Sequence, residues 1–200
     1  ALGNFTAGVV LVSDHSADIG GTDPGAGNVI SGNGPYGIWL YGGNGNKNTR
    51  IQGNLIGTTA DQSGELPNWR GIEINGAGAN FTDNVLIGGA EAGAGNVISG
   101  NSILGIQILG AAAAGVRLQG NTIGTNRDGT AAIPNAQHGV LVENARGVLI
   151  GADGDGIADD REGNIIAYNA SAGISVIGVA AQGNSIRGNA IYSNDGLGID

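Results

Sequence analysis

The apolar residues of this chain follow a pattern that repeats along most of its length. A glycine is followed by apolar residues at the first and third positions after it, as in Gly37-Ile38-Trp39-Leu40. The pattern recurs every 34 residues, which is the difference between 71 and 37 and between each later pair of glycines. Apolar residues at alternate positions indicate a β-strand with one face in a core. The strands predicted from this element are 38–40, 72–74, 106–108, 140–142 and 174–176, with 9–11 ahead of them.

Each repeat holds two further short strands. The string Gly-Asn-Val-Ile-Ser-Gly-Asn begins at Gly27 and again at Gly95, and these starts are 95 − 27 = 68 residues apart, which is two repeats. A second strand is predicted at 18–20, 50–52, 85–87, 116–118, 148–150 and 185–187. A third strand opens at a Gly-Asn pair, whose asparagines are Asn28, Asn54, Asn96, Asn121, Asn164 and Asn189.

The three-strand repeat predicts an all-β fold, a right-handed parallel β-helix (a solenoid) of about six coils. Stacked coils lie about 4.8 Å apart, so equivalent inward residues form aliphatic ladders along the axis. A TIM barrel or a doubly wound sheet would need amphipathic helices of about 10–15 residues, and no such pattern occurs. We therefore expect residues 1–200 to form a single β-helix domain that is a segment of a longer solenoid.

The Gly-Asn pair marks the corner between the second and third strands. A sharp bend favours a positive φ angle, which glycine and asparagine tolerate. Stacked asparagine side chains can also hydrogen-bond from one coil to the next. We therefore expect the six asparagines of these pairs to form a structural ladder.

Composition supports an aliphatic core and excludes several functions. The chain has 41 glycines but only four prolines, and it lacks the Gly-X-Y period of collagen. It has no cysteine, which excludes disulfides, thiol catalysis and zinc–thiolate sites. The net charge of −9 disfavours binding to the phosphates of nucleic acids. No apolar run approaches the roughly 18 residues of a membrane span, so we expect no membrane insertion.

The Gly-Asn corners and three-strand coils resemble those of the pectate-lyase-like right-handed β-helix superfamily. The likeness is greatest to the Asn/Gly-rich repeats of large secreted or surface proteins of bacteria, and it extends over essentially the whole chain. The resemblance implies a secreted or cell-surface protein of bacterial origin. It leaves the activity open, because this superfamily contains lyases, hydrolases, epimerases, tailspikes, adhesins and inert spacers.

An acidic insertion precedes the fifth Gly-Asn corner. It resembles the calcium loop of EF-hands and thrombospondin-type repeats from the third loop position onward. The first position is Gly151 rather than Asp, so one ligand of that pattern is absent. The alternative is a solvated acidic loop tethered by Arg161. The calcium interpretation predicts a structural ion held by Asp153, Asp155, Asp159, Glu162 and the backbone carbonyl of Ile157.

The outward positions of the first strand in each coil hold the candidates for ligand binding. Trp39 and Tyr41 occupy such positions, and Trp69 and Arg70 come from the loop immediately before the strand that carries Glu73. Aromatic rings beside charged and amide groups suit sugars, which offer C–H faces and hydroxyl rims. A polysaccharide is therefore the expected ligand. In the alternative interpretation, Trp69 folds over Trp39 and covers apolar outward residues.

The sequence gives weaker support for catalysis. Glu73 and Glu143 lie two coils apart, so their backbones are about 10 Å from each other by the strand spacing, which suits an inverting carboxylate pair. A regular ladder makes such separations common, and His138 is a lone loop histidine. We therefore expect a non-catalytic module that serves as a rigid scaffold or as an adhesive, glycan-binding surface. The alternative is a polysaccharide lyase or glycoside hydrolase that acts on the same outward face.

The ends of the predicted solenoid carry unpaired strand edges. No amphipathic helix precedes the first coil, and Asp200 follows the start of a new strand. Unpaired edges are templates for pairing with another chain, so the uncapped coils predict end-to-end self-association.

Overall fold

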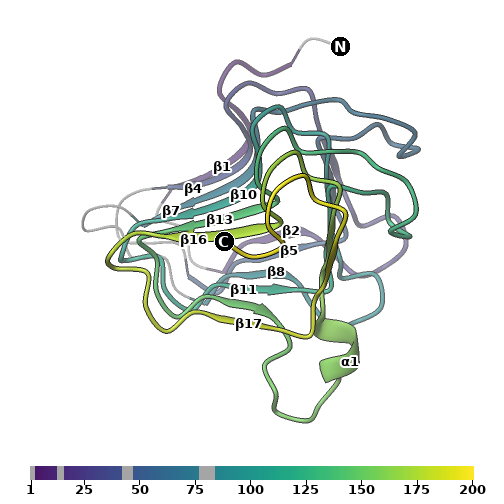
Figure 1. Ribbon diagram of the computed structural model, residues 1–200. Helices are drawn as coiled ribbons and strands as arrows, with labels where there is room; N and C mark the ends of the chain where they lie inside the picture. Colours follow the sequence, from purple (N-terminus) through teal and green to yellow (C-terminus); the bar gives the residue numbers. More distant parts are fainter. Residues whose placement is uncertain (1–2, 13–15, 42–46, 77–83) are drawn as a thin grey trace.

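The computed structural model describes residues 3–12, 16–41, 47–76 and 84–200 of the chain. In this part of the chain, eighteen short strands form three parallel sheets of six strands each, as Figure 1 shows for the first two sheets. Successive strands along the chain belong to the first, second and third sheet in turn. The chain is therefore a three-sided β-helix with about six coils, and this confirms the predicted fold class.

Each sheet takes one strand from each coil. The first sheet contains β1 (Ala7–Val12), β4 (Tyr36–Tyr41), β7 (Arg70–Asn75), β10 (Leu104–Leu109), β13 (Val140–Glu143) and β16 (Ile174–Ile177). The second sheet contains β2 (Asp18–Gly20), β5 (Arg50–Gln52), β8 (Leu86–Gly88), β11 (Arg117–Gln119), β14 (Leu149–Gly151) and β17 (Ser185–Arg187). The third sheet contains β3 (Val29–Ile30), β6 (Leu55–Ile56), β9 (Val97–Ile98), β12 (Thr122–Ile123), β15 (Ile165–Ala167) and β18 (Ala190–Tyr192).

The core consists of ladders of β-branched and leucine side chains, as the alternating pattern predicts. In the first sheet, Ile38, Ile72 and Ile106 pair in register and are fully buried. Branched side chains suit a pleated, buried surface, and each one leaves water as its coil stacks on the next. This stacking fixes the direction of the remaining side chains, because the residue between two buried ones must face outward.

Asparagine side chains link the coils at the corner between the second and third sheets. The six asparagines of the Gly-Asn pairs stack here, and each Nδ2 donates to the Oδ1 of the next at 2.8–3.0 Å. The central members also donate to a backbone carbonyl of the preceding coil, as Asn96 does to Ile51. These bonds satisfy polar groups that would otherwise be buried without partners.

A second asparagine ladder, which the sequence interpretation missed, lies at the corner between the third and first sheets. Its side chains are joined Nδ2 to Oδ1 at 2.8–3.0 Å from Asn4 onward. The repeated string that revealed the coils itself ends at Asn33 and Asn101, so the signal was present in the sequence. The further members are Asn33, Asn68, Asn101, Asn135, Asn169 and Asn194.

Some local features differ from the predicted elements, and most first-sheet strands extend beyond the predicted ranges, as β4 does. Three strands of the second sheet begin one residue later than expected, as β8 does at Leu86 instead of Val85. The acidic insertion contains a single helical turn, α1 (Asp159–Glu162), in a loop that projects from the coils in Figure 1. Its first residue follows Ala158, which has a positive φ of 61°. None of the helices in the described residues is long and apolar enough to span a membrane.

Candidate functional site

The candidate site lies on the outer face of the first sheet, where β4 and β7 pair in parallel. The register places Tyr36 beside Arg70, Trp39 beside Glu73 and Tyr41 beside Asn75. Because Ile38 and Leu40 point into the core, Trp39 and Tyr41 point outward. Two adjacent coils therefore bring the aromatic side chains of one strand against the charged side chains of the next.

The aromatic side chains of β4 form a stacked row. The ring centroids of Tyr36 and Trp39 are 4.6 Å apart with an interplanar angle of 14°, and those of Trp39 and Tyr41 are 4.6 Å apart at 22°. The indole thus lies between the two phenol rings, which occupy its faces. Tyr41 is the more accessible end of this row, with 41% of its surface exposed. A sugar ring that stacks on the row would therefore meet Tyr41 rather than a face of Trp39.

Glu73 is held at the base of this row. The Trp39 Nε1–H donates to Glu73 Oε1 at 3.1 Å, and the Asn75 side-chain amide donates to the same oxygen at 3.4 Å. Arg70 Nε lies 3.6 Å from Glu73 Oε2, and the Arg70 guanidinium lies 5.7 Å from the centroid of the Tyr36 ring. The aromatic row and the charged pair are consequently one connected cluster.

The side chain of Glu73 faces outward, but the residue as a whole is only 4% exposed. Burial raises its pKa, because the charged form loses hydration, while Arg70, Asn75 and Trp39 act in the opposite direction. Burial also raises the pKa of the Tyr36 hydroxyl, and the nearby Glu73 adds to that effect. The cluster therefore contains a carboxyl group with an enhanced affinity for a proton.

The other predicted residues of this face are placed as follows. Trp69 is 52% exposed, and its backbone N–H donates to the Gly34 carbonyl at 3.0 Å. In the described residues, no ring contact joins Trp69 to Trp39. Gln107 pairs with Glu73 in the register, and its Nε2 donates at 3.2 Å to Oε2 of Glu143, which lies one coil further on and pairs with Leu109. The two glutamates are thus separated by a buried amide.

Tyr36 is a member of the cluster that sequence reasoning missed. It directly precedes the glycine of its strand, at the position that Arg70 and His138 occupy in later coils. That equivalence was a usable signal, because Arg70 at this position was already a candidate for ligand binding. The alternation did not mark Tyr36 as outward because it lies three positions before Trp39, at the phase of the inward residues Ile38 and Leu40.

The acidic insertion brings together three of its five predicted calcium ligands. The carboxylates of Asp153, Asp159 and Glu162 offer ligand atoms that all lie within 4.8 Å of one another. Asp155 lies outside this group, and its Oδ1 accepts a hydrogen bond from the Ile157 N–H at 2.7 Å. Backbone N–H groups also donate to the other carboxylates, as that of Asp153 does to Glu162 Oε2 at 2.9 Å. The three clustered carboxylates are the donor type that calcium prefers.

Comparisons with known proteins returned no match. No family model, no curated protein and no solved structure matches the chain. The chemistry of the site itself must therefore indicate the function.

Proposed function

We propose that this chain is a non-catalytic β-helix module that binds a polysaccharide on the outer face of its first sheet. The observation that carries the proposal is the stacked row Tyr36–Trp39–Tyr41, joined through Glu73 and Arg70 to the next coil. Exposed aromatic rings next to fixed polar groups suit the C–H faces and hydroxyls of sugars. In this proposal Tyr41 and the exposed Trp69 contact the sugar, and Trp39 supports the Tyr41 ring.

The cluster is favourable for binding because it is organised before a ligand arrives. The Trp39 ring is fixed by two stacking neighbours and one hydrogen bond, so little side-chain freedom remains to be lost on binding. Arg70 is fixed in turn by Glu73 and Tyr36. The regular backbone of two paired strands holds all of these groups.

The Asn/Gly-rich coils support a wider proposal about the protein's setting. We propose that the chain belongs with the pectate-lyase-like β-helix proteins of bacteria and works in a secreted or cell-surface protein. The support is the resemblance of its coils together with three parallel sheets and stacked asparagine corners. A rigid solenoid would then serve both as a spacer and as the carrier of the aromatic row.

Glycan-array binding tests the proposed function. We expect the wild-type chain to bind a polysaccharide, and Trp39→Ala and Tyr41→Ala each to weaken that binding by about tenfold or more, the usual cost of a central aromatic contact. Tyr41→Phe keeps the ring and should retain most of the affinity. Tyr192→Ala is the matched control, since Tyr192 is 39% exposed but lies on the third sheet.

Two results would contradict this proposal. If the chain bound none of the neutral and acidic glycans, its role would be that of a scaffold without glycan binding. Equal losses in Tyr192→Ala and Tyr41→Ala, with unchanged thermal midpoints, would remove the aromatic row from the binding site.

A second candidate function, a polysaccharide lyase or glycoside hydrolase, is favoured by one observation. Glu73 is a carboxyl group with a raised pKa, which is a property of general acids. Its burial beneath Trp39 disfavours contact with a substrate, so binding remains the better proposal. Release of reducing sugar or unsaturated uronate that is lost in both Glu73→Gln and His138→Ala would establish this second function.

A further inference from the structure

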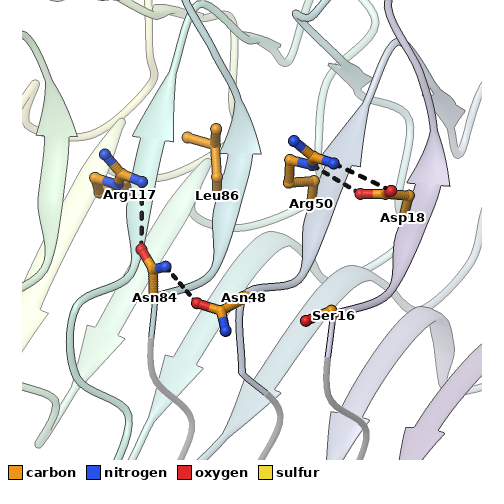
Figure 2. Close-up of a pocket in the computed structure, with 7 residues that line it drawn as sticks. All are labelled: Ser16, Asp18, Asn48, Arg50, Asn84, Leu86 and Arg117. Carbon is orange, nitrogen blue, oxygen red and sulfur yellow. Dashed lines mark hydrogen bonds and ion pairs between the residues drawn. The ribbon is translucent and has the colours of Figure 1, made fainter.

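A groove of about 460 Å³ lies on the outer face of the second sheet, away from the aromatic row. Its floor is formed by Asp18, Arg50, Leu86 and Arg117, which come from four successive coils. Figure 2 shows Leu86 between the two arginines. Arg50 and Arg117 are two coils apart, which is about 10 Å by the strand spacing.

Both guanidinium groups are held in position yet keep free donors. Asp18 accepts two hydrogen bonds from Arg50, at 2.7 and 3.2 Å, and both side chains are more than half exposed. Arg117 donates to Asn84 Oδ1 at 3.3 Å. A guanidinium has five N–H donors, so these contacts orient each arginine without using up its capacity to bind an anion.

The rim of the groove is polar in the first three coils, which carry Asp18, Arg50 and Leu86. The rim residues Ser16, Asn48 and Asn84 have φ angles of 70°, 53° and 53°, and Asn84 Nδ2 donates to Asn48 Oδ1 at 2.6 Å. The equivalent corner residues of the next three coils are glycines, with φ angles of 63–68°: Gly115, Gly147 and Gly183.

This change of residue at one corner points to a ligand. A positive φ suits glycine, and a serine there carries a backbone cost. The first three coils place a hydroxyl and two amides at this positive-φ position, next to the groove, where the later coils have glycine. The rim thus offers hydrogen-bonding groups in the coil of Arg50 and in the coil of Leu86, where Asn84 accepts from Arg117.

We propose that this groove binds a sugar acid, a polyhydroxylated carboxylate. The carboxylate would accept hydrogen bonds from Arg50 and Arg117, with the ring's C–H face over Leu86 and its hydroxyls against Asn48, Asn84 and Ser16. A bare inorganic anion would leave the Leu86 side chain and the amide rim unused. This site is separate from the aromatic row and does not rest on the function proposed for it.

Titration followed by NMR tests the proposal. We expect D-glucuronate to shift the side-chain resonances of Asn84 and Arg117, and its uncharged methyl ester to bind about tenfold more weakly, since charge-assisted hydrogen bonds are lost. Arg117→Gln should weaken glucuronate binding by about tenfold. Asn84→Gly removes the rim amide at a backbone angle that glycine accepts, and it should weaken binding by a smaller factor.

Two control variants distinguish this groove from a general charge effect and from the aromatic row. Arg127→Gln removes the same charge from a loop outside the groove and should leave glucuronate affinity unchanged. Trp39→Ala should also leave it unchanged, so failure of one site is distinguishable from failure of the other. The affinity of a glucuronate-containing tetrasaccharide identifies the source of the sugar acid. If the tetrasaccharide binds more tightly than glucuronate, the ligand is a sugar acid within a polymer. If both bind equally, the ligand is the free acid.

Three results would overturn the proposal. Equal binding of glucuronate and its methyl ester would exclude recognition of the carboxylate. Equal binding of glucuronate and acetate would exclude recognition of the sugar. An equal loss of binding in Arg127→Gln and Arg117→Gln would show a general charge effect instead of a site.

Discussion

At the scale of single residues, position in the coil decides the chemistry of a side chain. Glu73 and Glu143 both lie on the outward face of the first sheet, two coils apart, and Glu73 is the buried one of the two. Trp39 and Arg70 exclude water from the carboxyl group of Glu73. Their interactions with it replace only part of the hydration that the charged form loses. The raised pKa of Glu73 follows from this balance, in which desolvation is the larger effect.

The first prediction concerns the pH dependence of stability at Glu73. The folded chain holds this proton more tightly than the unfolded chain, whose glutamate pKa is about 4.3. The folded state therefore binds more protons in the window above that value, and stability falls as the pH rises through the raised pKa. Glu73→Gln cannot ionise, so its thermal midpoint relative to wild type should increase from about pH 4 to about pH 7.

Thermal melts of both proteins across this range, in one buffer series, make the measurement. A midpoint difference that stays constant with pH would contradict the prediction. A difference that decreases with rising pH would show that Arg70 outweighs burial and that the pKa is lowered instead.

At the scale of elements, the corners contribute as much order as the strands. Strands of two or three residues in the second and third sheets are too short to be stable alone, and the asparagine ladders fix their stacking. Asn96 illustrates the arrangement. Its Oδ1 accepts bonds from the backbone N–H and the side chain of Asn54, and its Nδ2 donates to Ile51 O and Asn121 Oδ1.

The second prediction concerns this ladder. Asn96→Ala leaves the buried backbone N–H of Asn54 without its acceptor, which costs about 1–3 kcal/mol. It also removes the hydrogen bonds from Asn54 Nδ2 to Asn96 and from Asn96 Nδ2 to Ile51 O, each worth about 1 kcal/mol. We expect a loss of about 2–5 kcal/mol in the free energy of unfolding, measured by urea denaturation. Asn28→Ala is the control, because Asn28 is an exposed member of the same ladder, and it should cost less than about 1.5 kcal/mol. Equal losses in the two variants would exclude desolvation as the cause.

The third prediction concerns the loop that contains α1. We propose that calcium binds the clustered carboxylates of Asp153, Asp159 and Glu162. Calcium at ten times its Kd should stabilise the fold by about 1.4 kcal/mol, which raises the thermal midpoint by about 3–6 °C. Asp159→Asn should abolish this shift. Asp160→Asn, which removes a neighbouring carboxylate outside the cluster, should retain it. A midpoint that chelator leaves unchanged would rule out the ion.

At the scale of the whole molecule, stability is distributed along one axis. The strand order of each sheet follows the coil order, so each coil pairs with the coil before it and the coil after it. In such a solenoid, stability is approximately a sum of coil terms and nearest-neighbour terms. The same geometry lets separate faces carry separate sites, as with the aromatic row on the first sheet and the groove on the second.

The fourth prediction follows from nearest-neighbour stacking. Ile51 and Ile150 lie three coils apart, about 14 Å by the strand spacing. Ile51→Val and Ile150→Val should each lower the free energy of unfolding by about 0.5–1.5 kcal/mol. Their double variant should be additive within about 0.5 kcal/mol. Ile51→Val with Ile87→Val alters two side chains that pair directly, and should deviate from additivity by more. Urea denaturation of the singles and doubles measures both, and strong coupling of the distant pair would contradict the nearest-neighbour description.

The sequence by itself determined the coil. The 34-residue period, the alternating apolar positions and the Gly-Asn corners predict three strands per coil, because they act through local backbone geometry and burial, which repeat wherever the pattern does. It also located Trp39, Tyr41, Arg70 and Glu73 on adjacent strands. The small shifts at the starts of some second-sheet strands do not alter which residues face the core.

Tertiary structure alone decided what the outward side chains do. Burial of Glu73, stacking of Tyr36 on Trp39 and the position of Leu86 between two arginines depend on the register of neighbouring coils, which are separated by loops of unequal length. The asparagines of the second ladder recur in the repeated string of the sequence. Their hydrogen bonds join neighbouring coils, so these bonds exist only when the coils are stacked. Local periodicity specifies a solenoid, whereas contacts across coils require the alignment that packing imposes.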